Sequence, residues 1–206
     1  MASPEVMRQQ EAVISKYIQG PPTALYDIGI GNKTEWKTLH DLYTEMALYG
    51  CEPMLNHYPT MEKDFPGKIK QVAVGDISGN AKVYVRPASV PDGCETMIDR
   101  FSIGVYEEVP MWTLDQFDEW AGHQERILLW MDIEGFEYPA LKGATKLLQS
   151  GRVKWINLEE KRDLVVEGAW SSPCDIVKLL ESYGYRRKLE YHIHKAHQDV
   201  IYCLGK

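Results

Sequence analysis

Three carboxylates lie close together in the segment LLWMDIEGFEY, residues 128–138. Asp132 directly follows an apolar run that is typical of a buried strand, and Glu134 and Glu137 follow it two and five residues later. The helix dipole favours acids near the start of a helix, which accounts for Glu137 and is compatible with Glu134. Asp132, at the strand tip, needs another explanation. Glu159 repeats the pattern after the next apolar run, so two strand tips supply acids for a general base or a divalent-cation site.

A glycine motif, DIGIGN at residues 27–32, follows another apolar segment. Gly29 and Gly31 allow the backbone to turn tightly and to approach a ligand closely. Glu52 lies 21 residues after Gly31, at the distance expected for the acceptor of a ribose hydroxyl. Thr34 replaces the third glycine of a phosphate-binding G-x-G-x-x-G motif. The motif therefore favours an adenosyl ligand without phosphates over a dinucleotide.

Several other side chains have a functional and a structural interpretation. Asp76 ends a third apolar segment. It is either the acceptor for an adenine amino group or a turn residue. His192 and His194 share one face of an expected strand. They are candidate bases, a paired zinc site or exposed hairpin residues. Trp170 is a stacking platform for a sugar ring or a packing residue. Lys161 binds an anionic part of the acceptor or is simply solvated.

Apolar segments with strand character alternate with amphipathic segments along the chain. We expect strands at 24–26, 48–51, 69–74, 81–85, 103–111, 127–131, 153–158, 185–192 and 199–204. We expect helices at 4–19, 34–47, 55–63, 113–121, 137–149 and 171–183. This order predicts an α/β fold whose sheet is mostly parallel, with helices on both faces and a β-hairpin at the end. Ligands bind outside the carboxyl ends of such strands, where carboxylates are not costly.

Length and composition fit one domain over residues 1–206, with an N-terminal helix in residues 1–20, alone or as part of a longer multidomain chain. The net charge of −7 argues against a general nucleic-acid or anionic-membrane binder. No stretch approaches the roughly 20 apolar residues of a membrane span, and the start lacks a signal-peptide pattern. The four cysteines are far apart in the sequence, which predicts reduced thiols in a cytoplasmic protein.

Four parts of the sequence together resemble the FkbM-type methyltransferases, which are S-adenosylmethionine-dependent O-methyltransferases. They are YDIGIGN (26–32), EP (52–53), QVAVGDISGNAKVYV (71–85), and TLDQF with LLWMDIEGFEYPALKGA (113–117 and 128–144). The last is the most specific, because D-x-E-G-x-E after a strand, followed by L-K-G-A, is similar to the family's hallmark. The resemblance covers 24–160, and 184–204 is similar to the family's ending. The turn at 31–33 departs from the usual small residues, and 86–110 is hard to align.

The resemblance implies a Rossmann-like class I methyltransferase fold with a mostly parallel seven-stranded sheet, an antiparallel C-terminal strand and helices on both faces. It also implies S-adenosyl-L-methionine as the cofactor. The implied contacts are Asp27, Gly29 and Gly31 for the methionine part, Glu52 and Pro53 for the ribose, Asp76 for the adenine and Asp132 for the transferred methyl group.

Methyl transfer to a hydroxyl requires the acceptor oxygen within about 3 Å of the methyl carbon, and removal of its proton. A sugar hydroxyl is a weak nucleophile at neutral pH, so a base or a metal such as Mg or Mn must activate it. The candidates are Asp132, Glu134, Glu159, His192 and His194. Asp132 and Glu159 are favoured, either as bases or as metal ligands, while Glu134 is either a supporting acid or the base itself.

Sugar hydroxyls are common targets within the FkbM-type family, so the resemblance favours a sugar or glycan acceptor, for example a deoxyhexose such as rhamnose or fucose. A polyketide-like small molecule is the alternative acceptor. The alternative functions are a nucleotide-dependent oxidoreductase on the same fold and a non-catalytic domain of a larger glycan-modifying protein. The missing third glycine and the acid-rich strand tip count against the oxidoreductase. The expected partners are neighbouring glycan-modifying domains or enzymes.

Overall fold

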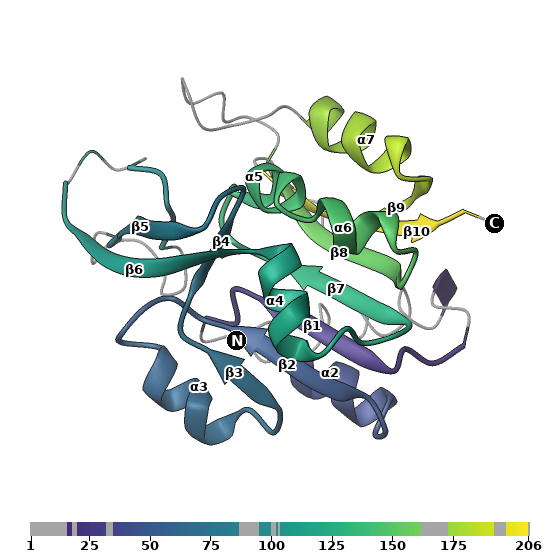
Figure 1. The fold of residues 1–206 in the computed structure, drawn as a ribbon, viewed down its shortest axis with the longest axis horizontal. Coiled ribbons are helices and arrows are strands. Elements are labelled where there is room, and N and C mark those ends of the chain that lie inside the picture. The colour runs from purple at the N-terminus through teal and green to yellow at the C-terminus, as the bar shows by residue number, and fades with distance from the viewer. Residues whose placement is uncertain are drawn as a thin grey trace.

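The structure, a computed structural model, describes residues 16–17, 20–31, 35–86, 95–99, 102, 104–161, 173–191 and 197–205. Most of the helix predicted at 4–19 lies outside the described residues, but Lys16 and Tyr17 are helical. Figure 1 shows a large sheet flanked by helices and a smaller sheet beside it. Among the described residues, no helix combines the length and the apolar composition that crossing a membrane requires.

The main sheet has seven strands in the order β3-β2-β1-β7-β8-β10-β9. Their bounds are β1 (Ala24–Ile28), β2 (Ala47–Cys51), β3 (Lys68–Lys70), β7 (Ile127–Met131), β8 (Val153–Lys161), β9 (Tyr185–Tyr191) and β10 (His197–Leu204). The pairs among β3, β2, β1, β7 and β8 are all parallel. The last strand, β10, runs antiparallel to both of its neighbours. This confirms the predicted Rossmann-like sheet with an antiparallel C-terminal strand.

Side chains of the main sheet enter two separate cores because successive residues of a strand point to opposite faces. In β1, Tyr26 and Ile28 pack into one core with residues of α4, α5, α6 and α7, whereas Leu25 packs into the other with residues of α2 and α3. The helices are α2 (Glu35–Leu42), α3 (Tyr58–Asp64), α4 (Leu114–Ala121), α5 (Glu137–Lys142), α6 (Thr145–Gln149) and α7 (Pro173–Ser182). The prediction of helices on both faces is confirmed.

The smaller sheet has the order β4-β6-β5, formed by β4 (Ala73–Gly75), β5 (Gly79–Tyr84) and β6 (Tyr106–Thr113). The prediction of one strand at 69–74 is therefore wrong. The chain turns after Lys70, where the Val72 N–H donates to the Lys70 carbonyl. The residues of β3 stay half-buried or exposed at the edge of the main sheet, whereas β4 is fully buried and pairs with β6.

The helix predicted at 137–149 is broken into α5 and α6, and the one predicted at 34–47 ends at Leu42. Gly143 lies at the break, where a Cβ would be 2.3 Å from the Gly75 carbonyl oxygen. This close approach of α5 to β4 needs a residue without a side chain and prevents a straight continuation. The helix predicted at 34–47 ends early because the chain enters β2 at Ala47, whose N–H donates to the Thr23 carbonyl beside β1.

The strand register brings the ends of β1, β2 and β7 level with Leu158 in β8, which continues to Lys161. Ile28 lies opposite Cys51 in β2 and Met131 in β7, and Met131 lies opposite Leu158 in β8. Because these strands are parallel, their carboxyl ends meet at one edge of the sheet, where ligands bind in this fold class. The residues that follow along this edge are Gly29, Glu52, Asp132 and Glu159.

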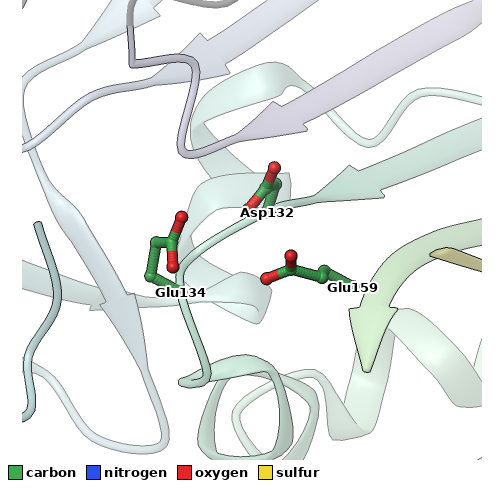
Figure 2. Close-up of side chains that lie close together, drawn as sticks. All are labelled: Asp132, Glu134 and Glu159. Atoms are coloured by element: carbon green, nitrogen blue, oxygen red, sulfur yellow. The ribbon is translucent and has the colours of Figure 1, made fainter. Parts of the chain in front are cut away.

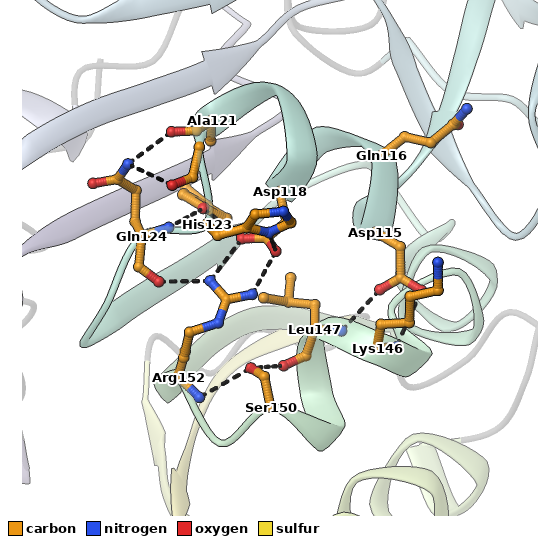
Figure 3. A network of polar contacts seen from close by, with 12 residues as sticks. Asp115, Gln116, Asp118, Ala121, His123, Gln124, Lys146, Leu147, Ser150 and Arg152 are labelled. Carbon is orange, nitrogen blue, oxygen red and sulfur yellow. Dashed lines mark hydrogen bonds and ion pairs between the residues drawn. The ribbon is translucent and has the colours of Figure 1, made fainter.

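A buried ion pair stabilises the opposite, amino-terminal side of the sheet (Figure 3). Asp118 in α4 accepts hydrogen bonds from Arg152 and from the Tyr26 hydroxyl, at 3.0 and 2.8 Å. His123 Nδ1 lies 2.8 Å from the same carboxylate. Arg152 also donates to the Gln124 carbonyl. These contacts connect α4 with the segments that enter β7 and β8, so they fix the strands whose far ends carry the acids.

Candidate active site

A pocket of about 540 Å3, counting the space open to solvent, lies at the carboxyl edge of the main sheet. One wall comes from the ends of β1, β2 and β7, including Gly29, Gly31 and Glu52. The other wall comes from the small sheet and the segment 95–97. The predicted ligand site at the strand tips is therefore a real concavity, and the small sheet, which the sequence analysis did not predict, closes it.

The two glycines of the DIGIGN motif both line the pocket. Gly29 has φ +85°, and a Cβ there would lie 2.5 Å from the Asp132 carbonyl oxygen. Gly31 has φ +57°, and its N–H donates to Glu52 Oε2 at 2.7 Å. Residue 29 thus requires glycine by contact, whereas at residue 31 the left-handed backbone favours glycine without requiring it. The pair brings bare backbone to the pocket wall, as a closely bound ligand requires.

Glu52 is a buried acid in the wall of the pocket, with 3% of its surface exposed. Its Oε1 accepts a hydrogen bond from the Met54 N–H at 2.8 Å, and its Oε2 accepts one from Gly31. Burial raises the pKa of Glu52 above its ordinary value, although these two N–H groups oppose the shift. Each carboxylate oxygen keeps a further lone pair. Glu52 is therefore oriented to accept a hydrogen bond from a ligand hydroxyl, and Pro53 lies beside it in the wall.

Asp132, Glu134 and Glu159 meet at the end of the pocket (Figure 2). One carboxylate oxygen from each lies within 4.8 Å of the others. Asp132 and Glu134 line the pocket, whereas Glu159 approaches from β8 behind them. Glu134 and Glu159 are buried, with 8% and 7% of their surfaces exposed. Carboxylates are the side chains that serve as general bases and that supply oxygen ligands to cations.

The turn that carries Asp132 and Glu134 is held from two sides. Glu137 Oε1 accepts hydrogen bonds from the N–H groups of Ile133 and Gly135, at 3.1 and 3.3 Å. The Thr96 hydroxyl donates to the Glu134 carbonyl at 3.0 Å. Glu137 does lie in the first turn of α5, as predicted, but its carboxylate also braces the turn before it.

Glu134 has a left-handed backbone conformation, with φ +56°. For a residue other than glycine this conformation costs about 1 kcal/mol. Glycine would avoid the cost, so the position keeps a carboxylate at the expense of stability. Strained residues of this kind cluster at functional sites.

Two of the residues predicted to contact the cofactor do not line the pocket. Asp27 is buried in β1, two residues before Gly29. Asp76 is partly exposed, and its Oδ2 accepts a hydrogen bond from Lys142 Nζ at 3.0 Å. Asp76 directly follows β4, which belongs to the small sheet and not to the main sheet, and this accounts for its position outside the pocket.

The predicted acceptor-binding residues can be located only in part. Lys161 is the last residue of β8, and its side chain lies outside the described part of the structure. Trp170, His192 and His194 also lie outside the described residues. Their roles remain predictions.

Sequence analysis missed a group of charged residues in the second wall. Glu95 lines the pocket, and its two oxygens lie 3.5 Å from His57 Nε2 and 3.4 Å from Arg86 Nε. Burial alone raises the pKa of Glu95, but hydrogen bonding to His57 and the charge of Arg86 outweigh it and hold the pKa below its ordinary value. The sequence holds little signal for this group, since residues 86–102 contain two prolines and a glycine without a clear period.

Comparison with known proteins identifies the family. The model of the methyltransferase FkbM domain matches residues 32–187. The chain belongs to the FkbM methyltransferase family. None of the curated proteins matches the chain. The resemblance inferred from the four sequence segments is thereby confirmed.

Solved structures of other methyltransferases share the fold of this FkbM-family protein. Magnesium protoporphyrin IX methyltransferase from Synechocystis PCC 6803, with bound SAH, has a TM-score of 0.51 at 9% identity, over 98% of this chain and 82% of that one. Fibrillarin from Aeropyrum pernix, with bound S-adenosyl-L-methionine, has a TM-score of 0.51 at 15% identity, over 95% and 74%. At these identities the likeness shows the class I methyltransferase fold alone.

Proposed function

We propose that this FkbM-family protein is an S-adenosylmethionine-dependent O-methyltransferase that acts on a hydroxyl of a sugar or glycan in the cytoplasm. Residues of the pocket fit two parts of the cofactor. Bare backbone at Gly29 and Gly31 suits the methionine part, and Glu52 suits the ribose hydroxyls. When bound, the cofactor supplies a methyl group that its sulfonium centre has already activated.

The meeting of Asp132, Glu134 and Glu159 carries the proposal. Asp132 follows β7 at the pocket wall, which supports its carboxylate as the base that takes the proton from the acceptor hydroxyl. A positioned base contributes about 10²–10⁴-fold to the rate of such a step.

The acidic surroundings also support the choice of acceptor. Hydroxyl groups donate hydrogen bonds to carboxylates, so a polyol such as a deoxyhexose of the rhamnose or fucose type is compatible with this end of the pocket. Phosphate or carboxylate groups on the acceptor would be repelled by the same acids. Family membership favours methyl transfer over the oxidoreductase alternative.

The test is the Asp132→Asn variant, with Asp41→Asn on the exposed face of α2 as the matched control. Transfer of a labelled methyl group would be measured on a panel of free sugars, glycans and polyketide-like alcohols, and SAH binding by calorimetry. We expect Asp132→Asn to lose turnover at least 100-fold while keeping SAH affinity within a few-fold, and the control to match the wild type. Full activity of Asp132→Asn would refute the assignment of the base.

Further conditions separate the alternatives. Loss of activity with a chelator, restored by Mg or Mn, would show that the three acids hold a divalent cation instead of acting as a base. Binding of NAD but not SAH would favour the oxidoreductase. SAH binding without transfer to any acceptor would favour a non-catalytic domain.

A further inference from the structure

The pocket combines an apolar lining with buried charge. Met54, Val83 and Met97 line it, and the first two belong to a small buried core under the small sheet. Glu95 and His57 lie in the same wall, with only 6% and 7% of their side chains exposed. The pair is close to Glu52, since the charges of both His57 and Glu95 act on its pKa.

A flat aromatic ring in this apolar space would be stabilised by burial, but its polar edge would need partners. Adenine carries an exocyclic amino group, which donates hydrogen bonds and does not accept them. Glu95 offers a buried acceptor in the described part of the wall. Its contacts with His57 and Arg86, at 3.5 and 3.4 Å, leave lone pairs on both oxygens. The lowered pKa keeps the carboxylate ionised at neutral pH.

We propose that Glu95, held in place by His57 and Arg86, accepts a hydrogen bond from the exocyclic amino group of the cofactor's adenine and so selects adenosyl over inosyl ligands. The proposal rests on the proposed function, in which the pocket binds S-adenosylmethionine. It replaces Asp76, which the sequence suggested for this role, because Asp76 lies outside the pocket and pairs with Lys142.

The contact has a measurable consequence for ligand selection. S-inosylhomocysteine differs from SAH in carrying a carbonyl oxygen where adenine carries its amino group. In wild type that oxygen would face the Glu95 carboxylate, so two acceptors would meet without a proton between them. A site built to bind a donor rejects an analogue that lacks it. A hydrogen bond to a charged group contributes about 1.5–3 kcal/mol, which corresponds to a preference for SAH of roughly 10- to 100-fold.

Calorimetry with both ligands tests this on the full chain. Glu95→Gln is nearly isosteric, and its amide can present either a donor or an acceptor, so we expect SAH binding to weaken about 10-fold and the preference to fall to a few-fold. Glu95→Asp keeps the charge but shortens the side chain, and it should also lose most of the preference. Glu108→Gln, on the exposed side of β6, is the matched control and should behave as wild type.

Three results would overturn the proposal: equal wild-type affinity for the two ligands, an unchanged preference in both Glu95 variants, or loss of the preference in Asp76→Asn instead. Failure of the proposed function has a different signature, because the wild type would then bind neither ligand. Since the wild-type comparison needs no variant, the proposal stays testable even if a Glu95 variant does not fold.

Discussion

Glu134 offers the sharpest test of how this site uses strain and charge. The residue has a left-handed backbone, with φ +56°, and its carboxylate lies within 4.8 Å of two others. Glu134→Gly would remove both features, and Glu134→Gln would remove the charge alone. We therefore expect both variants to unfold at higher denaturant concentration than wild type, with the glycine variant the more stable of the two, and both to lose activity.

The magnitudes follow from the geometry. Relief of the backbone conformation contributes about 1 kcal/mol in the glycine variant alone. Two ionised carboxylates at the 4.8 Å limit of this group repel by about 3 kcal/mol at an effective dielectric constant near 20. In a protein of this size, each 1 kcal/mol raises the melting temperature by about 2–4 °C.

Urea unfolding and labelled-methyl transfer on the same preparations provide the assay. The difference in unfolding free energy between the glycine and glutamine variants isolates the backbone contribution. A glycine variant less stable than wild type would refute the argument, since it would mean that Glu134 stabilises the fold. A more stable glycine variant with full activity would show that the carboxylate has no catalytic role.

Four further predictions concern the residues that support the site. Arg152→Met should lower the free energy of unfolding by about 3 kcal/mol, because it leaves Asp118 buried without its cation. The lowered pKa of Asp118 contributes stability that is present above the ordinary aspartate pKa and is lost as the pH falls through the pKa of the folded state. Urea unfolding at a series of pH values should show that Asp118→Asn removes this acid sensitivity. SAH affinity should fall as the pH drops through the raised pKa of Glu52, since the protonated acid loses acceptor capacity, and calorimetry should find no such pH dependence in Glu52→Gln. Gly29→Ala should abolish SAH binding and cost about 2–4 kcal/mol, whereas Gly31→Ala, where a Cβ meets open space, should cost about 1 kcal/mol.

The sequence contained enough information to place the acids but not to build the second wall. Asp132 and Glu159 follow apolar runs whose length marks buried strands, and parallel strands bring their carboxyl ends to one edge. The position of these acids at the edge of the sheet therefore follows from the apolar pattern of the strands and from their parallel arrangement. The contact between Glu95 and His57 joins residues 38 positions apart that carry no periodic signal. Only the folded chain shows it.

The departure of β4 from the main sheet explains most of what sequence reasoning missed. A strand at 69–74 in the main sheet would have delivered Asp76 to the carboxyl edge beside Glu52. The turn after Lys70 instead carries Ala73–Gly75 into the small sheet, where packing against β6 outweighs continuation of the edge strand. No local propensity distinguishes these two outcomes, because both bury the same valine-rich segment. The same turn creates the wall that holds Glu95.

The position of Glu159 bears on how an acceptor would approach in the proposed function. Asp132 and Glu134 line the pocket and Glu159 does not, although all three carboxylates meet. The cluster therefore marks a border, with the cofactor pocket on one side and β8 on the other. Asp199 in β10 lies directly opposite Glu159, so the two side chains share one face of the sheet. Under the proposed function, an acceptor that came from the β8 side would meet Glu159 and Asp199 first. It would need hydroxyl groups or positive charge to be stabilised there, so these two acids would restrict the choice of substrate.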